Sequence, residues 1–141
     1  MRKETINVAV YSAHGNPADV LRVESQPWPR PGPEEVVVEL RAAPINPADL
    51  NAIEGKYPGK REVPAVPGFE GSGIVSKLGK NVSELTIGSV VILPHHLGTW
   101  REACAVKAEQ LVVVPSEVDP VQAAMLKINP LTAWQIGRAH V

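Results

Sequence analysis

Tyr57 is the residue whose type and surroundings best suit chemistry, and it lies in the segment Gly-Lys-Tyr-Pro-Gly at residues 55–59. The glycines and the proline predict a loop, and they leave the phenol ring few packing partners along the chain. A phenol at the edge of a cleft can donate a proton, with the charge of Lys56 beside it. A half-exposed loop tyrosine without a catalytic role explains the same residues, and local sequence leaves both readings open.

Four histidines and one cysteine raise the question of a metal site. His95 and His96 are neighbours at the predicted end of a strand, where successive side chains point to opposite faces, so we expect them not to share an ion. His14 and Cys104 have no ligand spacing around them, and a single cysteine excludes an internal disulfide and a thiolate zinc cluster. We therefore predict no metal, and we predict that Cys104 packs in the core as a small apolar residue.

Two other catalytic signatures are missing from the sequence. It contains no Gly-x-Ser-x-Gly turn for a nucleophilic serine. The segment Gly-Phe-Glu-Gly-Ser-Gly at residues 68–73 has three glycines, but not in the order Gly-x-Gly-x-x-Gly, and a strand is predicted after it in place of a helix. We interpret this segment as a turn and not as a dinucleotide-binding loop.

Asn46 and Asn129 each precede a proline, and Asp49 follows Asn46 by three residues. Helix capping explains both asparagines without a ligand. A favourable charge in the first turn of a helix explains Asp49. The local sequence therefore does not indicate a binding or catalytic role for these three residues.

Composition predicts one small domain that is mainly β. The 141 residues suffice for one domain and not for a complete two-domain enzyme. Fourteen prolines, about twice the usual share, together with eleven glycines disfavour long helices.

Charge and hydropathy give no indication of a nucleic-acid or membrane partner. The formal net charge is −1, without the excess of basic residues that nucleic acids or membrane surfaces attract. No apolar run approaches the ~20 residues of a membrane span, and the N-terminus has no secretory signal, so we expect a cytoplasmic chain.

About seven short strands are predicted at intervals of roughly ten residues, which favours a barrel or sandwich over alternating βαβ units. They cover residues 7–11, 20–23, 36–40, 73–76, 89–93, 102–106 and 110–114. A short helix is predicted over residues 46–55, because Asn46 can cap it, Pro47 suits its first position and Gly55 can end it. Further helical pieces are predicted from Asp119 and after Pro130.

The last six residues, Ile-Gly-Arg-Ala-His-Val at 136–141, resemble the peptide that a common short-read sequencing adapter encodes in one reading frame. We therefore expect the natural sequence to stop being informative at about Gln135, and we keep His140 out of any site. Native codons for these six residues, followed by a stop codon, would refute this interpretation.

Five segments carry a family resemblance: APINPADLN at 43–51, EGKY at 54–57, PAVPGFEG at 64–71, LGTWR at 97–101 and INPLTAW at 128–134. In order and spacing they resemble the mitochondrial-type trans-2-enoyl-CoA/ACP reductases, a zinc-independent branch of the medium-chain dehydrogenase/reductase superfamily. The match runs from residue 6 to about residue 135. No single segment is decisive, but five in register indicate the family.

The resemblance implies a mainly β fold, a GroES-like partial β-barrel with short helices. Residues 1–118 would form this catalytic domain, and residues 119–135 would begin the connection to an NADPH-binding Rossmann domain that is absent from this chain. It also implies that no metal is bound, because Asn46 and Phe69 stand where the zinc alcohol dehydrogenases have their cysteine and histidine ligands.

In this family, a tyrosine of the Gly-x-Tyr loop is the proposed proton donor, and it corresponds to Tyr57. An asparagine of the Asn-Pro-x-Thr-Ala motif contacts the cofactor and corresponds to Asn129; we assign Thr132 of that motif and Asn46 to cofactor binding as well. The implied reaction transfers a hydride from NADPH to Cβ of a 2-enoyl thioester of CoA or acyl carrier protein, and a proton to Cα. The implied enzyme is a homodimer, mitochondrial in a processed eukaryotic form, and this fragment alone would be inactive.

Two residues depart from the family pattern, and two other functions stay open. Phe69 and Trp134 replace an asparagine and a tyrosine of relatives, so the preferred acyl chain length is undetermined. A quinone oxidoreductase-like NADPH reductase would share the Gly-x-Tyr loop, but such proteins usually have a Gly-Gly-Tyr-Ala type segment where this chain has residues 97–101. A GroES-like binding module without catalysis is the third reading, and the helix signals at 119–135 count against it.

Overall fold

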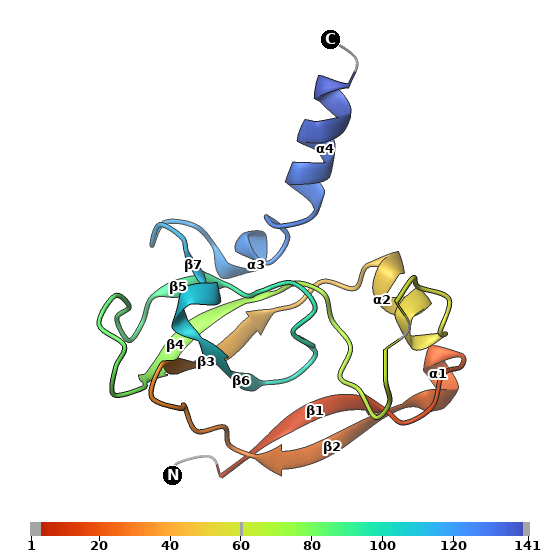
Figure 1. Ribbon diagram of the computed structural model, residues 1–141, viewed down its shortest axis with the longest axis horizontal. Coiled ribbons are helices and arrows are strands. Elements are labelled where there is room, and N and C mark those ends of the chain that lie inside the picture. Colours follow the sequence, from red (N-terminus) through yellow and green to blue (C-terminus); the bar gives the residue numbers. More distant parts are fainter. Residues whose placement is uncertain (1–3, 60, 140–141) are drawn as a thin grey trace.

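The computed structural model describes residues 4–59 and 61–139 and contains two antiparallel sheets with short helices around them (Figure 1). Strand β1 (Thr5–Tyr11) pairs with β2 (Leu21–Pro27) in the smaller sheet. The larger sheet has the strand order β6-β3-β4-β5-β7. Its members in chain order are β3 (Glu35–Ala42), β4 (Ser72–Leu78), β5 (Val90–Ile92), β6 (Ala103–Lys107) and β7 (Val112–Val113). The predicted mainly β architecture is confirmed, and over the described residues the two sheets do not close into one barrel.

The helices are α1 (Pro17–Val20), α2 (Pro47–Ile53), α3 (Pro120–Ala123) and α4 (Asn129–Arg138), with a 3₁₀ turn η1 at Ala108–Gln110. The predicted helix after Asn46 is confirmed as α2, and Gly55 follows it with a φ of +76°. The one-turn helix α1 was not predicted. The side chain of Asn16 accepts a hydrogen bond from the backbone N–H of Ala18 at 3.1 Å, so Asn16 caps α1.

Three strands differ most from the prediction. Val20 belongs to α1, and β2 continues to Pro27, four residues beyond its predicted end. The strand predicted over 89–93 is β5, with three residues. The strand predicted over 110–114 is only the two-residue β7, because η1 occupies the residues before it.

Strand β3 is the centre of the core because both of its faces are covered. Val36, Val37 and Val38 are all fully buried, and successive side chains of a strand point to opposite faces. Val36 and Val38 pack with β4, β5 and β6 in one cluster, whereas Val37 packs with the apolar side chains of β1. A continuous apolar run in the sequence therefore corresponds to a strand between two layers.

Cys104 on β6 lies in this core with 3% of its surface exposed, as predicted. Burial raises the pKa of its thiol to about 11, and the charge of Arg101 opposes that shift. Because the thiolate is the reactive form of cysteine, we expect iodoacetamide near pH 8 to label Cys104 only when the protein opens. Mass spectrometry with and without urea measures this, and rapid labelling of the folded chain would contradict it.

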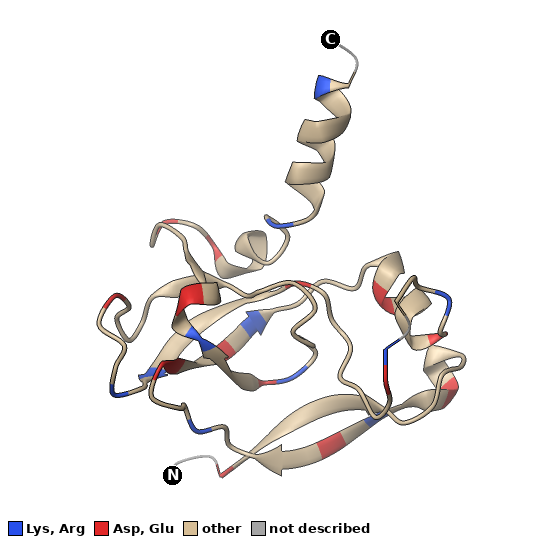
Figure 2. Ribbon diagram, in the orientation of Figure 1, with Lys and Arg blue, Asp and Glu red and all other residues tan. Residues whose placement is uncertain are grey.

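Charged residues of both signs are interspersed along the strands and loops (Figure 2). This distribution accords with the net charge of −1. Within residues 4–59 and 61–139, no helix combines the length and the apolar character needed to cross a membrane.

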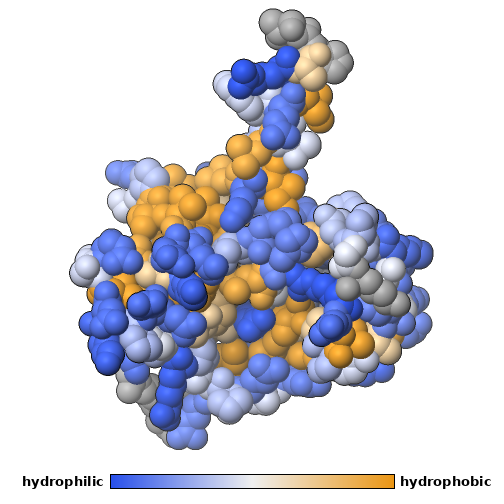
Figure 3. All heavy atoms as spheres, viewed as in Figure 1, coloured by the Kyte–Doolittle hydropathy of each residue, from blue (hydrophilic) through white to orange (hydrophobic). Residues whose placement is uncertain are grey.

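Helix α4 stands away from both sheets, and all of its described side chains are exposed (Figure 1). Helix α3, in contrast, packs on the larger sheet through Ala123, which contacts Ile92 and Val114. Apolar surface gathers where α4 leaves the body of the protein (Figure 3). The exposed apolar residues of this region are Val112, Val113, Val121, Met125, Leu126, Leu131, Trp134 and Ile136.

Candidate functional site

Tyr57 lies at a pocket of about 350 Å³ that is lined by Tyr57, Pro58, Gly59, Arg61, Phe69 and His96. The tyrosine is half-buried. Its ring packs against Phe69, with 5.0 Å between ring centroids, and lies 6.3 Å from the ring of His96. The Tyr57 ring therefore packs against residues from segments that are distant in the sequence. The loop glycines and proline place the phenol at the pocket, and Phe69 supports its ring.

Arg61, which lines this pocket, contacts the segments on which Phe69 and His96 lie. Its Nη1 donates to the carbonyl oxygen of Val66 at 3.0 Å, and its Nη2 donates to that of His96 at 2.5 Å. Its guanidinium carbon lies 5.5 Å from the centroid of the Phe69 ring, within the range of a cation–π interaction. Arg61 therefore fixes the two residues that the Tyr57 ring contacts.

His95 and His96 lie in a tight turn, so their predicted placement at a strand end was wrong. His96 has a φ of +64°, and this turn brings the two rings to a centroid distance of 3.8 Å in place of opposite faces. Burial lowers the pKa of His96, and the charges of His95 and Arg61 act in the same direction. In the part of the chain that the structure describes, no three His, Cys, Asp or Glu residues form a metal-binding group.

Glu70 joins the start of α2 to the start of α4. Its side chain is fully buried. Oε1 accepts a hydrogen bond from Nδ2 of Asn46 at 3.0 Å, and Oε2 accepts one from the backbone N–H of Ile128 at 3.2 Å. The sequence interpretation missed this residue because it treated segment 68–73 as a turn only. The sequence could have indicated the role of Glu70, because its carboxylate stands among apolar and glycine residues. A carboxylate buried in such surroundings is retained only where it has hydrogen-bond partners.

Asp49 has a larger role than a charge in the first turn of α2. It is 1% exposed. Its Oδ2 accepts from the backbone N–H of Asn46 at 2.7 Å, and its Oδ1 accepts from the backbone N–H of Phe69 at 2.9 Å. Asp49 therefore ties α2 to the residue that supports the Tyr57 ring. Burial raises the pKa of the Asp49 carboxyl, although both N–H groups and the charges of Arg61 and His95 oppose the shift.

We expect the substitution Asp49→Asn to remove a pH-dependent part of the stability. The folded carboxyl keeps its proton to a higher pH than the unfolded one, whose pKa is about 3.9. The folded chain therefore binds more protons between these two values, and its free energy of unfolding falls as the pH rises through that window. Urea unfolding from about pH 3.5 to about pH 6 should show wild type losing stability relative to the variant. A wild-type advantage that grows with pH would contradict this.

The structure separates the sequence-predicted site residues into two groups. Asn46 caps α2 and is joined through Glu70 to the residue before α4. On α4, Asn129 is exposed, and Thr132 donates from Oγ1 to the carbonyl oxygen of Ile128 at 2.9 Å. Tyr57 makes no hydrogen bond to these three residues among the described parts of the chain; its ring packs on Phe69, which is next to the Glu70 that binds Asn46.

The turn that carries Phe69 and Glu70 is held by the segment 97–101. The backbone N–H of Gly98 donates to the carbonyl oxygen of Gly68 at 3.1 Å, and that of Trp100 donates to the carbonyl oxygen of Pro67 at 3.0 Å. The buried hydroxyl of Thr99 donates to the carbonyl oxygen of Glu70 at 2.7 Å. Segments that are distant in the sequence thus meet at one turn.

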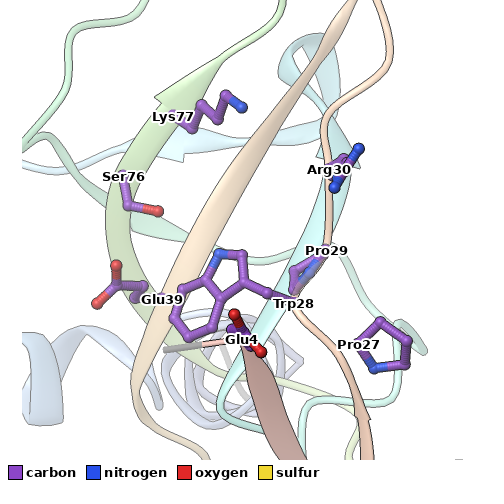
Figure 4. Close-up of a pocket in the computed structure, with 8 residues that line it drawn as sticks. All are labelled: Glu4, Pro27, Trp28, Pro29, Arg30, Glu39, Ser76 and Lys77. Atoms are coloured by element: carbon purple, nitrogen blue, oxygen red, sulfur yellow. The ribbon is translucent and has the colours of Figure 1, made fainter. Parts of the chain in front are cut away.

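A larger hollow of about 770 Å³ lies elsewhere and shares no lining residue with the Tyr57 pocket (Figure 4). The Trp28 indole lies among the carboxylates of Glu4 and Glu39 and the cations of Arg30 and Lys77. The hydroxyl of Ser76 donates to the carbonyl oxygen of Val37 at 3.3 Å. Because the charges are mixed and the hydroxyl is engaged, we assign no chemistry to this hollow.

Comparison with known proteins connects this geometry to a family. Residues 32–116 match the alcohol dehydrogenase GroES-like domain. The chain is 40% identical over 128 residues to the mitochondrial enoyl-[acyl-carrier-protein] reductase of Xenopus tropicalis, a match that covers 90% of this chain and 37% of that protein. The human protein of the same name is 39% identical over 132 residues, covering 93% and 35% of the two chains.

Solved structures show the same fold. The complex of Etr1p with NADP and crotonyl-CoA matches with a TM-score of 0.88 and 32% identity, over 97% of this chain and 44% of that chain. Etr1p is also part of a mitochondrial 2-enoyl thioester reductase Etr1p/Etr2p heterodimer from Candida tropicalis. A Bacillus thuringiensis protein assigned as an NADPH:quinone reductase matches with a TM-score of 0.85 and 39% identity, over 94% of this chain and 40% of that chain.

The chain spans a little over a third of the length of the curated relatives that it matches. The resemblance inferred from the five segments is confirmed, because these relatives are enoyl reductases that match along almost the whole chain. The match to the family domain includes more than half of the residues and all of β3 to β7. By sequence and by fold, the chain belongs to the alcohol dehydrogenase GroES-like domain family.

Proposed function

We propose that this chain is the N-terminal catalytic domain of an NADPH-dependent 2-enoyl thioester reductase of fatty acid synthesis. The observation that carries the proposal is the position of Tyr57. The residue that aligns with the family's proton donor is half-buried at a pocket, against Phe69 and near His96. The solved complex of Etr1p with crotonyl-CoA supports a thioester substrate. The acyl carrier is CoA or acyl carrier protein.

In the proposed reaction, bound NADPH supplies a hydride to Cβ of the enoyl thioester. Negative charge then develops on the thioester carbonyl, and Cα becomes a basic carbon. The hydroxyl of Tyr57 donates its proton to Cα, so that an O–H bond breaks and a C–H bond forms. The phenolate that remains takes a proton from solvent. The donation is downhill because an enolate carbon is more basic than a phenolate.

Asn46, Asn129 and Thr132 would hold the cofactor. All three are neutral residues with hydroxyl or amide groups, and such groups fit the carboxamide and ribose hydroxyls at the nicotinamide end better than the phosphates. Asn129 and Thr132 lie on exposed α4, and Thr132 keeps its oxygen lone pairs while its proton is donated to Ile128. We propose that a Rossmann domain, joined through residues 119–135 to the domain of residues 1–118, supplies the phosphate contacts.

The complete enzyme is proposed to be a homodimer, and to be mitochondrial if the source is eukaryotic. The Etr1p/Etr2p heterodimer supports a dimeric assembly, and the mitochondrial relatives support the location. The isolated chain is proposed to be inactive, because two of the three proposed cofactor residues, Asn129 and Thr132, lie on a helix whose described side chains are all exposed to solvent. A measurable rate of NADPH oxidation by residues 1–141 alone would contradict that.

A quinone reductase is the second candidate function, because the Bacillus thuringiensis protein is 39% identical to this chain. One assay decides between the two. The complete protein, expressed from its native gene, is given NADPH with either crotonyl-CoA or a benzoquinone, and NADPH oxidation is followed. We expect a much larger kcat/KM with crotonyl-CoA. A preference for the quinone would overturn the enoyl reductase proposal in favour of the second candidate.

A further inference from the structure

His14 lies outside the Tyr57 pocket but contacts both ends of the loop that carries Tyr57. Its Nδ1 lies 3.1 Å from the carbonyl oxygen of Ile53, the last residue of α2. Its Nε2 lies 3.0 Å from the carbonyl oxygen of Arg61. The loop between Ile53 and Arg61, which includes Tyr57, therefore has both of its ends in contact with the same imidazole ring.

The ring is closely packed in this position. A Cβ added to Gly55 would lie 3.1 Å from Cγ of His14, so a side chain at this position would press on the ring. The ring of Tyr11 on β1 lies 5.8 Å away. The backbone N–H of Gly15 donates to the same carbonyl oxygen of Ile53 at 3.2 Å. His14 therefore has little freedom to turn away from the two carbonyl groups.

The number of protons on the ring decides how many of these contacts are hydrogen bonds. Both partners are carbonyl oxygens, which only accept. A neutral imidazole has one N–H and satisfies one carbonyl, whereas an imidazolium has two and satisfies both.

We propose that His14 is a positioning residue for Tyr57, whose imidazole ring holds the two ends of the loop together through the carbonyl groups of Ile53 and Arg61. The inference rests on the proposed function, in which Tyr57 is the proton donor. His14 is not among the residues that line the pocket. It therefore acts through the geometry of the loop and not on the substrate.

Hydrogen–deuterium exchange of the complete protein tests this role without any reference to activity. The reporters are the amides of Lys56 and Tyr57, which donate to the carbonyl oxygen of Asn51 at 2.8 and 3.1 Å. The variant His14→Asn keeps a donor near the position of Nδ1 only, and His14→Gln keeps one near Nε2 only. We expect both variants to lose about threefold to tenfold of the loop protection, the effect of one hydrogen bond.

A peptide covering residues 82–90 is the internal control, because it contributes nothing to the His14 contacts. Its protection should stay the same in both variants. Unchanged protection of the Tyr57 loop overturns the proposal. Equal losses in the loop and in the control peptide also overturn it, because His14 would then support the whole fold and not this loop.

Kinetics of the complete enzyme give the second readout. We expect His14→Gln to lower kcat while the KM for NADPH stays the same. The variant Tyr57→Phe separates the two hypotheses. If it lowers kcat and the His14 variants do not, the positioning role is refuted. If Tyr57→Phe leaves kcat unchanged, Tyr57 is not the proton donor. The proposal that His14 positions a proton donor then fails as well.

Discussion

The substitution Tyr57→Phe in the complete enzyme is expected to lower kcat about 100-fold to 10,000-fold, the usual contribution of a general acid. The change removes one oxygen atom and keeps the aromatic ring, so the contact with Phe69 at 5.0 Å is preserved. The KM for NADPH should change little, because none of the residues proposed to hold the cofactor lines the Tyr57 pocket. Steady-state kinetics with crotonyl-CoA measure both quantities.

The only other tyrosine of the chain provides a matched control. Tyr11 is buried, and within the described residues its hydroxyl has no hydrogen-bond partner. The variant Tyr11→Phe removes the same atom from the same type of ring, and kcat should stay at the wild-type value. Similar kcat values for both variants and wild type would exclude Tyr57 as the proton donor.

The sequence contains the same helix signal twice, and the two copies show how far local sequence predicts a helix. Asn-Pro-Ala-Asp occurs at residues 16–19 and at 46–49. The second copy continues with Leu-Asn-Ala-Ile and forms the seven-residue α2, which was predicted. The first copy continues with Val-Leu-Arg-Val, whose β-branched residues favour a strand, so α1 ends after four residues and was missed. The signal for a helix start is local, but the length of the helix depends on the residues after that signal.

The site was predictable only where one short segment carries the information. Tyr57 could be found from the loop residues around it and from the family resemblance. The contacts that position it could not, because each joins distant segments. Asn46 and Glu70 are 24 residues apart, His14 and Arg61 are 47 apart, and Glu70 and Ile128 are 58 apart. A periodicity or a motif gives no register between such segments, so these partners emerge only from the packed fold.

Asp49→Ala is the substitution with the largest expected effect on stability. It leaves the backbone N–H groups of Asn46 and Phe69 in a buried site without an acceptor. Since each buried donor without a partner costs about 1 to 3 kcal/mol, the free energy of unfolding should fall by about 3 kcal/mol or more. Urea unfolding near pH 7 measures the loss. Asp49→Asn should be intermediate, because its one carbonyl oxygen can still accept from Phe69.

The repeated tetrapeptide supplies the control for Asp49. Asp19 occupies the same position after Asn16, Pro17 and Ala18, in the first turn of α1, but it is exposed. If Asp49 acted only through its charge at a helix start, Asp49→Ala and Asp19→Ala would cost the same. We expect Asp19→Ala to cost a small fraction of the loss in Asp49→Ala. The difference between the two losses would measure how much the hydrogen bond from Phe69 to Asp49 contributes to the free energy of unfolding. This hydrogen bond connects α2 to the residue that packs against the Tyr57 ring.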